Sequence, residues 1–254
     1  LLESVYDTLD PMLDSSFDIV CAGITNQRET TLVWDSVSGE PIYNGIVWQD
    51  RRTADYCSSL KARNLEPIIN AKTGLLLDPY FSATKISWIL DNVQGARAKA
   101  DKGKLRFGTV DTFLLWQLSE GSIFKTDVTN ASRTNIYNIH AKEWDDDLLK
   151  IFNVPRSMLP EVHASDASFG MFERNNKNLK ITGVIGDQQS ALVGQRCFEP
   201  GEMKATFGTG CFLMVNTGQE SKDSSSGLLN TLGYQLSGHS PYALEGSIFS
   251  AGTI

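Results

Sequence analysis

The chain has 254 residues, of which 41% are hydrophobic and 21% charged, and this composition excludes a disordered or low-complexity protein. Its formal net charge is −7 without any block of lysines and arginines, which argues against a nucleic-acid partner because phosphate backbones repel an acidic surface. No apolar run is long enough to span a bilayer, so we expect no membrane span.

The two ends of the chain are unusual. The first nine residues carry apolar side chains at helical spacing, so we expect the chain to start inside a helix. It opens on Leu1 without Met or a signal peptide and stops at Ile254 directly after an apolar stretch. Because natural termini are usually polar and frayed, we expect a piece of a longer protein.

Strands are expected early in the chain. Nearly every residue over 18–24 is apolar, as in a strand covered on both faces. Alternation over 31–35 and 41–43, around a Ser-Gly turn, predicts an antiparallel meander, and 46–48 predicts another short strand.

Helical spacing dominates the middle of the chain. It predicts helices near 53–63, 82–93, 111–119, 144–152 and 187–197. A buried strand over 182–186 leads into the last helix, and strands return after Met203. Mixed strands and helices of this kind indicate an α/β fold.

Cysteine and histidine give no sign of a metal or disulfide framework. No pair among the four cysteines has C-x-x-C spacing, and the three histidines lie far apart. We expect free thiols in a reducing compartment, and therefore a cytoplasmic protein. Metal ligands remain unknown from the sequence.

The first candidate for chemistry is the polar segment 26–31, just past the carboxyl end of a predicted strand, where ligands collect in α/β sheets. Arg28 offers fixed donors and Glu29 an acceptor, which together can grip vicinal hydroxyls. A charge-assisted Arg28–Glu29 pair would preset their geometry. The competing interpretation is a turn with a local, exposed ion pair.

The second candidate is Asp187, with Gln188 and Gln189, between a strand and a helix. Its plain interpretation is a helix N-cap. Its functional interpretation is a carboxylate that accepts a proton from a substrate hydroxyl, as kinases acting on alcohols require.

The third candidate is the glycine-rich turn 207–211, whose backbone amides and Thr209 hydroxyl can face phosphate oxygens. An ordinary hairpin turn competes with this interpretation. The turn lacks the third glycine of the dinucleotide-binding pattern and the lysine of the P-loop, so both of those motifs are excluded.

The fourth candidate is aromatic. Tyr80 and Trp48 can line the apolar face of a small polyol, although core packing is the commoner fate of aromatic residues. Trp88, Trp116 and Trp144 are assigned to core packing.

These segments resemble the FGGY carbohydrate kinases. The helix after Tyr80 fits the signature of that family, with Ser82, Lys85, Ile86 and Trp88 in place. Four further segments match in the family's order: 26–31, 47–53, 186–189 and 207–212. The resemblance runs from about residue 18 to the end of the chain.

The resemblance implies two actin-like, ribonuclease-H-like α/β domains around a cleft. The first would cover 1–199 without its N-terminal strands, and the second would begin over 200–254. It implies ATP-dependent, Mg²⁺-dependent phosphorylation of glycerol to sn-glycerol 3-phosphate, and a homo-oligomeric full-length protein.

The resemblance also assigns roles to single residues. Those that would bind the substrate are Arg28, Glu29, Trp48, Tyr80, Asp187, Gln188 and Phe212. Asp187 would in addition be the general base. Thr209 would contact the terminal phosphates of the nucleotide, and Gly252 would lie on the nucleotide side.

One departure from the family pattern stands out: the D-x-G-T phosphate loop that opens family members does not occur in these 254 residues. We therefore expect this segment alone to be inactive. Two alternatives stay open: a kinase for another polyol or sugar, and a non-catalytic relative that binds glycerol.

Overall fold

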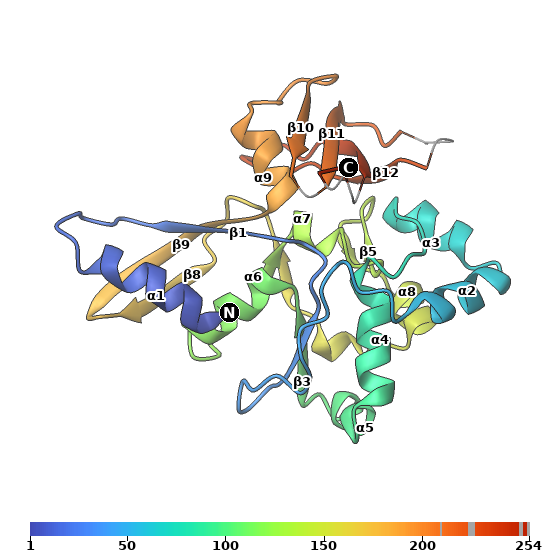
Figure 1. Ribbon diagram of the computed structural model, residues 1–254, viewed down its shortest axis with the longest axis horizontal. Coiled ribbons are helices and arrows are strands. Elements are labelled where there is room, and N and C mark those ends of the chain that lie inside the picture. The colour runs from blue at the N-terminus through green and yellow to red at the C-terminus, as the bar shows by residue number, and fades with distance from the viewer. Residues whose placement is uncertain (209, 223–226, 249–250, 253–254) are drawn as a thin grey trace.

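The computed structural model describes residues 1–208, 210–222, 227–248 and 251–252. It is a mixed α/β structure in which helix α9 and a four-stranded sheet gather at one end, at the top of Figure 1. Most of the helices lie at the other end, around α4 (Figure 1). The site lies where these two regions meet.

The chain starts in helix α1 (Leu2–Leu13), as expected. It lies near a three-stranded sheet of β1 (Ala22–Asn26), β9 (Lys177–Gly186) and β8 (Gly170–Arg174), to which an ion pair between Asp10 and Arg174 ties it. Strand β9 runs parallel to β1 and antiparallel to β8.

The expectation of a first strand buried on both faces is wrong. Strand β1 begins only at Ala22, alternates in burial, and follows Val20, which is 74% exposed. The physical reason is that only one face is covered: Ala22 and Ile24 pack against an apolar cluster, whereas Gly23 and Thr25 on the other face are exposed.

All five helices expected in the middle of the chain are confirmed. Their bounds are α2 (Ala54–Ala62), α4 (Ser82–Asn92), α6 (Val110–Leu118), α8 (Asp146–Phe152) and α9 (Asp187–Gly194). The helical segments that were not predicted are α3 (Glu66–Thr73), α5 (Ala96–Asp101), α7 (Val128–Ala131) and the 3₁₀ turn η1 (Arg156–Met158).

Short strands connect these helices. The pairs are β2 (Leu32–Asp35) with β3 (Leu105–Gly108), β4 (Lys125–Asp127) with β7 (Glu161–His163), and β5 (Tyr137–Asn138) with β6 (Glu143–Trp144). The expected meander is reduced to two isolated antiparallel bridges, one joining Thr31 to Ile46 and one joining Trp34 to Pro41, so 46–48 forms no full strand.

Strands return after Met203, as expected. The second sheet is antiparallel in the order β10 (Met203–Phe207), β11 (Cys211–Gly218), β13 (Tyr242–Ile248) and β12 (Leu229–Leu232). Its β12 contacts the helical region at Gly74, where the Asn230 amide donates to the Gly74 carbonyl oxygen at 2.9 Å. Gly74 has φ +71° and would place a side chain 2.5 Å from Asn230, so only glycine fits this contact.

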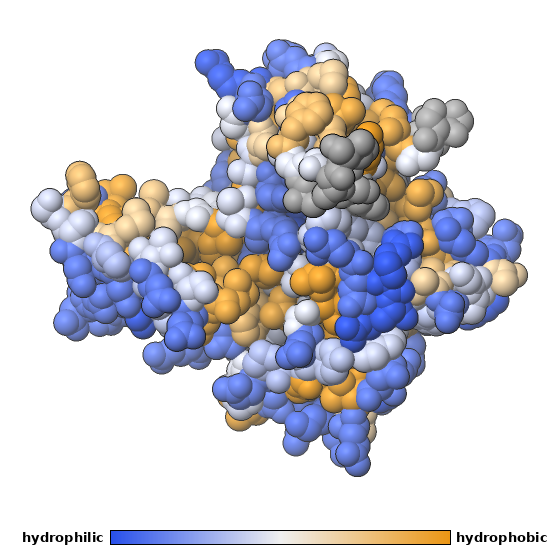
Figure 2. Space-filling view, in the orientation of Figure 1, coloured by the Kyte–Doolittle hydropathy of each residue, from blue (hydrophilic) through white to orange (hydrophobic). Residues whose placement is uncertain are grey.

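The largest apolar core surrounds α4, whose Ile86, Ile89 and Leu90 are buried against β2, β3 and α8. Trp144 is buried in this core, and Trp88 packs against it. Trp116 packs in a neighbouring apolar cluster. Figure 2 shows hydrophilic residues along much of the outer edge of the lower half, with apolar residues toward the middle of that face. In the described part of the chain, no helix has the length and apolarity needed to cross a membrane.

Candidate active site

A small cavity of about 130 Å³ lies between the two regions of the molecule. It is small beside the 300–1,000 Å³, roughly, of pockets for drug-sized ligands. The residues that line it are Gln27, Arg28, Glu29, Trp48, Tyr80, Asp187, Gln188 and Phe212. Seven of them are the residues that the sequence predicted to bind substrate, and the structure brings them together around one hollow.

Strand register explains why residues far apart in sequence meet here. Strands β1 and β9 are parallel neighbours, and Asn26 at the end of β1 lies opposite Gly186 at the end of β9. The chain beyond each strand therefore leaves the same sheet edge, which brings Arg28 and Asp187 together. Tyr80 precedes α4, and Phe212 comes from β11 of the second sheet.

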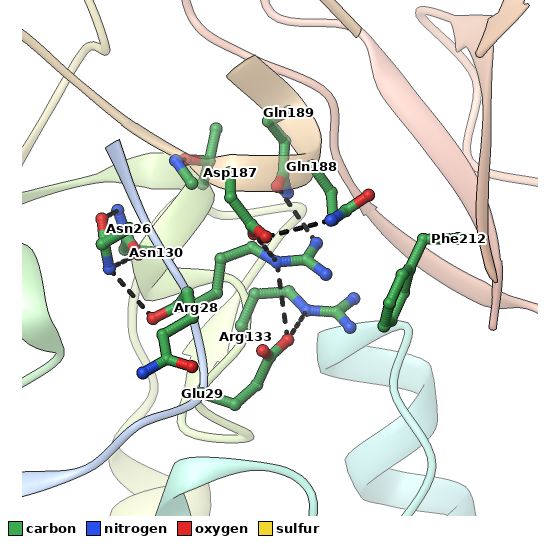
Figure 3. Close-up of polar contacts among 12 residues, drawn as sticks. Asn26, Arg28, Glu29, Asn130, Arg133, Asp187, Gln188, Gln189 and Phe212 are labelled. Carbon is green, nitrogen blue, oxygen red and sulfur yellow. Dashed lines mark hydrogen bonds and ion pairs between the residues drawn. The ribbon is translucent and has the colours of Figure 1, made fainter. Parts of the chain in front are cut away.

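The centre of the site is a buried set of alternating charges, which we call the arginine–glutamate cluster: Arg28, Glu29, Arg133 and Glu245. Arg28 donates to both carboxylate oxygens of Glu245, at 2.6 and 3.0 Å. Arg133 donates to Glu29 at 2.8 Å and to Glu245 at 3.0 Å. Figure 3 shows the two arginines side by side, with Asp187 above and Glu29 below.

The expected Arg28–Glu29 pair is present as an ion pair. Arg28 Nε lies 3.6 Å from Glu29 Oε1 without a hydrogen bond, and the forked end of Arg28 is held by Glu245. The alternative of a local exposed pair is wrong, since Arg28 is 1% and Glu29 2% exposed.

Glu245 and Arg28 keep their charges despite burial. Burial alone would raise the pKa of Glu245, but Arg133 and Arg28 outweigh it and lower that pKa to about 2. Burial would likewise lower the pKa of Arg28, yet Glu245 and Glu29 raise it well above its ordinary value. Each charge is thus held by opposite charges on its neighbours.

Asp187 is the first residue of α9, and its side chain faces the cavity. Gly186 is the N-cap of this helix, so the plain interpretation of Asp187 as an N-cap is wrong. Asp187 Oδ1 lies 3.5 Å from Arg28 Nε, and Oδ2 accepts from Gln188 Nε2 at 3.0 Å. The Asp187 side chain stays 43% exposed, so a substrate can reach it.

Gly186 fits tightly against Arg28. A Cβ at this position would lie 2.5 Å from Arg28 Cγ and 2.6 Å from Cδ. On its other side, the Gly186 amide donates to Thr129 Oγ1 at 2.8 Å. Glycine here lets the strand end approach the arginine stem closely enough to hold it in place.

Aromatic rings form the apolar wall of the cavity. The ring of Trp48 meets Tyr80 edge-on at 6.0 Å between centroids and Phe212 at 6.3 Å. The Arg133 guanidinium lies over the rings of Phe81 and Tyr80, at 5.2 and 5.8 Å. Burial, followed by the nearby Glu29 charge, raises the pKa of Tyr80, so its phenol stays protonated and can donate.

Two buried lysines stand behind the lining residues. Lys85 donates to the backbone carbonyls of Glu29 and Tyr80, at 2.9 and 2.8 Å. Lys204 on β10 donates to the Gln188 side-chain oxygen and, at 3.4 Å, to the Phe212 carbonyl. Burial lowers the pKa of each lysine to about 8.

Beside the site lies a second buried polar group, the aspartate cluster, built on Asp111 and Asp127. Asp127 accepts from the hydroxyls of Thr129 and Ser165, each at 2.7 Å. Asp111 accepts from Thr109 at 2.5 Å and from Thr126 at 2.7 Å. No arginine or lysine among the described ion pairs reaches either carboxylate, and burial raises both pKa values, that of Asp111 to about 6.

The sequence reasoning gave no site role to Arg133, Glu245 or Lys204. Glu245 is an isolated acid inside an apolar strand. Burying a carboxylate in such a strand is unfavourable unless a buried partner compensates its charge. That mismatch is the signal that could have found it. Nothing local distinguishes Arg133 or Lys204 from surface cations.

The nucleotide side is less defined. Thr209 lies outside the described residues, and Gly252 is exposed near the end of the chain. In the described ranges, no three His, Cys, Asp or Glu side chains gather closely enough to hold a metal ion. All four cysteines are free thiols, three of them buried.

Comparison with known proteins adds independent information. Residues 1–194 match the model of the N-terminal domain of the FGGY family of carbohydrate kinases. The glycerol kinase of Rhodopseudomonas palustris is 58% identical over 238 residues, covering 93% of this chain and 48% of that protein. Glycerol kinase 1 of Pseudomonas aeruginosa is also 58% identical, over 237 residues, 92% of this chain and 48% of its own. The chain spans about half the length of these curated relatives.

Solved structures agree on the fold. The Plasmodium falciparum glycerol kinase with ADP superposes with a TM-score of 0.92 at 41% identity, covering 99% of this chain and 51% of that chain. A gluconate kinase from Lactobacillus acidophilus reaches a TM-score of 0.83 at 18% identity, covering 98% of this chain and 51% of its own, which supports the fold alone. The fold is therefore the actin-like α/β fold of these kinases, and the chain belongs to the FGGY family of carbohydrate kinases.

Proposed function

We propose that these residues form the glycerol-binding part of a glycerol kinase, which transfers the γ-phosphoryl group of ATP to glycerol and yields sn-glycerol 3-phosphate. The observation that carries the proposal is the 130 Å³ cavity, whose lining combines an arginine, two carboxylates and the phenol of Tyr80 with the rings of Trp48 and Phe212. The similar glycerol kinases support it, and because they are about twice as long, the proposal concerns the complete protein.

Glycerol offers hydroxyls on one edge and carbon on the other, and the cavity has matching sides. Arg28 Nε is buried without a hydrogen-bond partner among the described residues, so it can donate to a substrate hydroxyl. Glu29 accepts from Arg133 through Oε1, and no described residue donates to its Oε2, which can accept a second hydroxyl. The wrong ligand would leave these buried groups unpaired, which is a strong basis for specificity.

Asp187 is the proposed general base. Its Oδ2 is held by Gln188, while Oδ1 lies beside Arg28 Nε and so beside any hydroxyl bound there. As the terminal glycerol oxygen forms its bond to phosphorus and the bond between phosphorus and ADP breaks, the hydroxyl proton passes to Asp187. Gln188 and Arg28 hold the carboxylate in place for that transfer.

ATP supplies the phosphoryl group, and we propose that Thr209 and Gly252 lie on its side of the site. We keep Mg²⁺ as a prediction, and since the described residues contain no metal-binding group, we assign no ligand and derive no step through it. The division into domains over 1–199 and 200–254, a homo-oligomeric state and a cytoplasmic location likewise remain proposals.

Steady-state kinetics of the complete protein test this function. ATP-dependent phosphorylation is measured with glycerol and with longer polyols or sugars at equal concentration. We expect the highest kcat/KM with glycerol, because the rings of Trp48 and Phe212 leave little room beyond a small polyol. A clear preference for a longer polyol, or calorimetric binding of glycerol without turnover, would overturn the proposal.

A further inference from the structure

Beyond the residues that contact the proposed substrate, we propose that two buried lysines, Lys85 and Lys204, are positioning residues that fix opposite walls of the glycerol cavity. Four of the eight lining residues are held by these two ammonium groups. The inference rests on the proposed function for its assay, but its geometry stands on the hydrogen bonds themselves.

Lys85 joins two segments that lie far apart in sequence. It comes from α4 and is fully buried, and its ammonium donates to the carbonyl oxygens of Glu29 and Tyr80. These are the two residues whose side chains offer the substrate an acceptor and a phenol. One cation therefore sets the distance between two substrate contacts.

Lys204 acts on the opposite wall. It is 4% exposed, and its ammonium donates to the Gln188 side-chain oxygen, to Thr206 Oγ1 at 3.0 Å and to the Phe212 carbonyl at 3.4 Å. An ammonium can only donate, so it fixes which end of the Gln188 amide faces it. The amide nitrogen must then face Asp187, where it donates at 3.0 Å.

The cost of burial shows that these lysines are not ordinary packing residues. Neither takes part in an ion pair within 4 Å among the described residues, so each is a buried charge that meets only neutral oxygens. Such burial is unfavourable unless every donor is used, and an apolar side chain would fill the space at lower cost. What only an ammonium supplies is the joining of several acceptors at one point.

The two lysines predict different kinetic effects. Lys85 holds groups that contact bound glycerol in the ground state, so its loss should raise the KM for glycerol. Lys204 acts through Gln188 on the base Asp187, so its loss should mainly lower kcat. Small displacements at a reacting centre change rates on the order of 10- to 100-fold.

The test compares the complete protein with Lys85→Met and Lys204→Met, which keep the side-chain length without the charge. Lys72→Met is the matched control, because Lys72 holds Asp145 in α8's N-terminal region, outside the cavity lining. We expect Lys85→Met to raise the glycerol KM about 10-fold or more with kcat nearly kept, Lys204→Met to lower kcat about 10-fold or more, and Lys72→Met to change neither.

Two further variants keep the test decisive if a Met variant fails to fold. Lys85→Gln retains an uncharged donor group, the amide NH2, and should show an intermediate KM. Gln188→Met removes the acceptor of Lys204 and should lower kcat as Lys204→Met does, with no further loss in the double variant. Folded variants with wild-type KM and kcat, or fully additive effects of Lys204 and Gln188, would overturn the inference. A wild-type protein that does not phosphorylate glycerol would instead overturn the proposed function.

Discussion

Two buried polar clusters lie side by side in this protein and shift the pKa values of their carboxylates in opposite directions. In the arginine–glutamate cluster, Glu245 faces Arg28 and Arg133, which lower its pKa to about 2. In the aspartate cluster, Asp111 meets hydroxyls and amides and has Asp127 nearby, and its pKa rises to about 6. Burial is equal in the two places, so the neighbours decide the charge state.

The difference separates two tasks. Pairing in the first cluster leaves Arg28 Nε and Glu29 Oε2, both on residues that line the cavity, without a hydrogen-bond partner among the described residues, which suits the recognition of hydroxyls. Neutral donors in the second cluster join segments of the scaffold: Asp127 holds Thr129, which in turn accepts from the Gly186 amide. Asp187 follows directly, so the second cluster supports the position of the proposed base.

The largest effect is expected from Glu245→Gln. It removes the carboxylate that accepts hydrogen bonds from both arginines and leaves buried positive charge without that partner, which costs about 3–5 kcal/mol of folding stability. Urea denaturation measures it. Lys222→Ala is the control, because the Lys222–Glu220 pair is exposed and such pairs contribute little. Equal midpoints for Glu245→Gln and wild type would show that the cluster is not held by this charge.

Gly186→Ala tests the contact between the two clusters. The new Cβ would overlap the stem of Arg28, whose far end is held by Glu245, so either the arginine or the strand end must shift. Overpacking of this kind costs about 1–3 kcal/mol. We also expect weaker glycerol binding by calorimetry. Gly194→Ala, where a Cβ meets nothing within 4 Å and alanine suits the helix, should lower neither quantity.

The smallest expected effects concern how the free energy of unfolding changes with pH. Glu245 and Asp111 should change it in opposite directions. Glu245 has a folded pKa below its ordinary 4.5, so the stability it contributes is present above pH 4.5 and is lost as pH falls toward 2. Asp111 has a folded pKa above its ordinary 3.8, so its contribution is full below pH 3.8 and is lost as pH rises through about 6.

Denaturation series from pH 3 to 7 on wild type, Glu245→Gln and Asp111→Asn separate these slopes, each at most about 1.4 kcal/mol per pH unit. The difference in free energy of unfolding between wild type and Glu245→Gln should become smaller as pH falls. As pH falls from 6 to 4, the free energy of unfolding of wild type should rise relative to that of Asp111→Asn. If the stability of wild type relative to each variant changed in the same direction with pH, the contrast between the two clusters would be contradicted.

The sequence predicted residues that line the cavity but missed the residues behind them that hold them in place. Arg28, Glu29 and Asp187 were found because polar residues directly after apolar strands are a local signal, and a parallel sheet brings such ends together. Glu245 and Arg133 act through pairings over more than 100 residues of sequence, which no local pattern encodes. For the same reason Glu245 was not predicted as the hydrogen-bond partner of Arg28.

The fold shows the same division. Five helices were predicted from their periodicity, whereas α3, with Pro67 near its start and Gly74 at its end, was missed although both are helix-end signals. Strand β1 was expected to be buried on both faces because composition alone does not show whether other elements cover both faces of a strand.

Asp187→Asn in the complete protein tests the central claim most directly. The amide keeps the size of the carboxylate and one of its two acceptor oxygens, which can still accept from Gln188, but it cannot take the hydroxyl proton. The measurement is kcat with ATP and glycerol, beside the glycerol affinity by calorimetry, with Asp55→Asn, another acid in the first turn of a helix, as control. We expect a fall in kcat on the order of 10²–10⁴-fold with affinity largely kept. Near-normal turnover would remove Asp187 from the role of base and contradict the account of this cavity as the place of phosphoryl transfer.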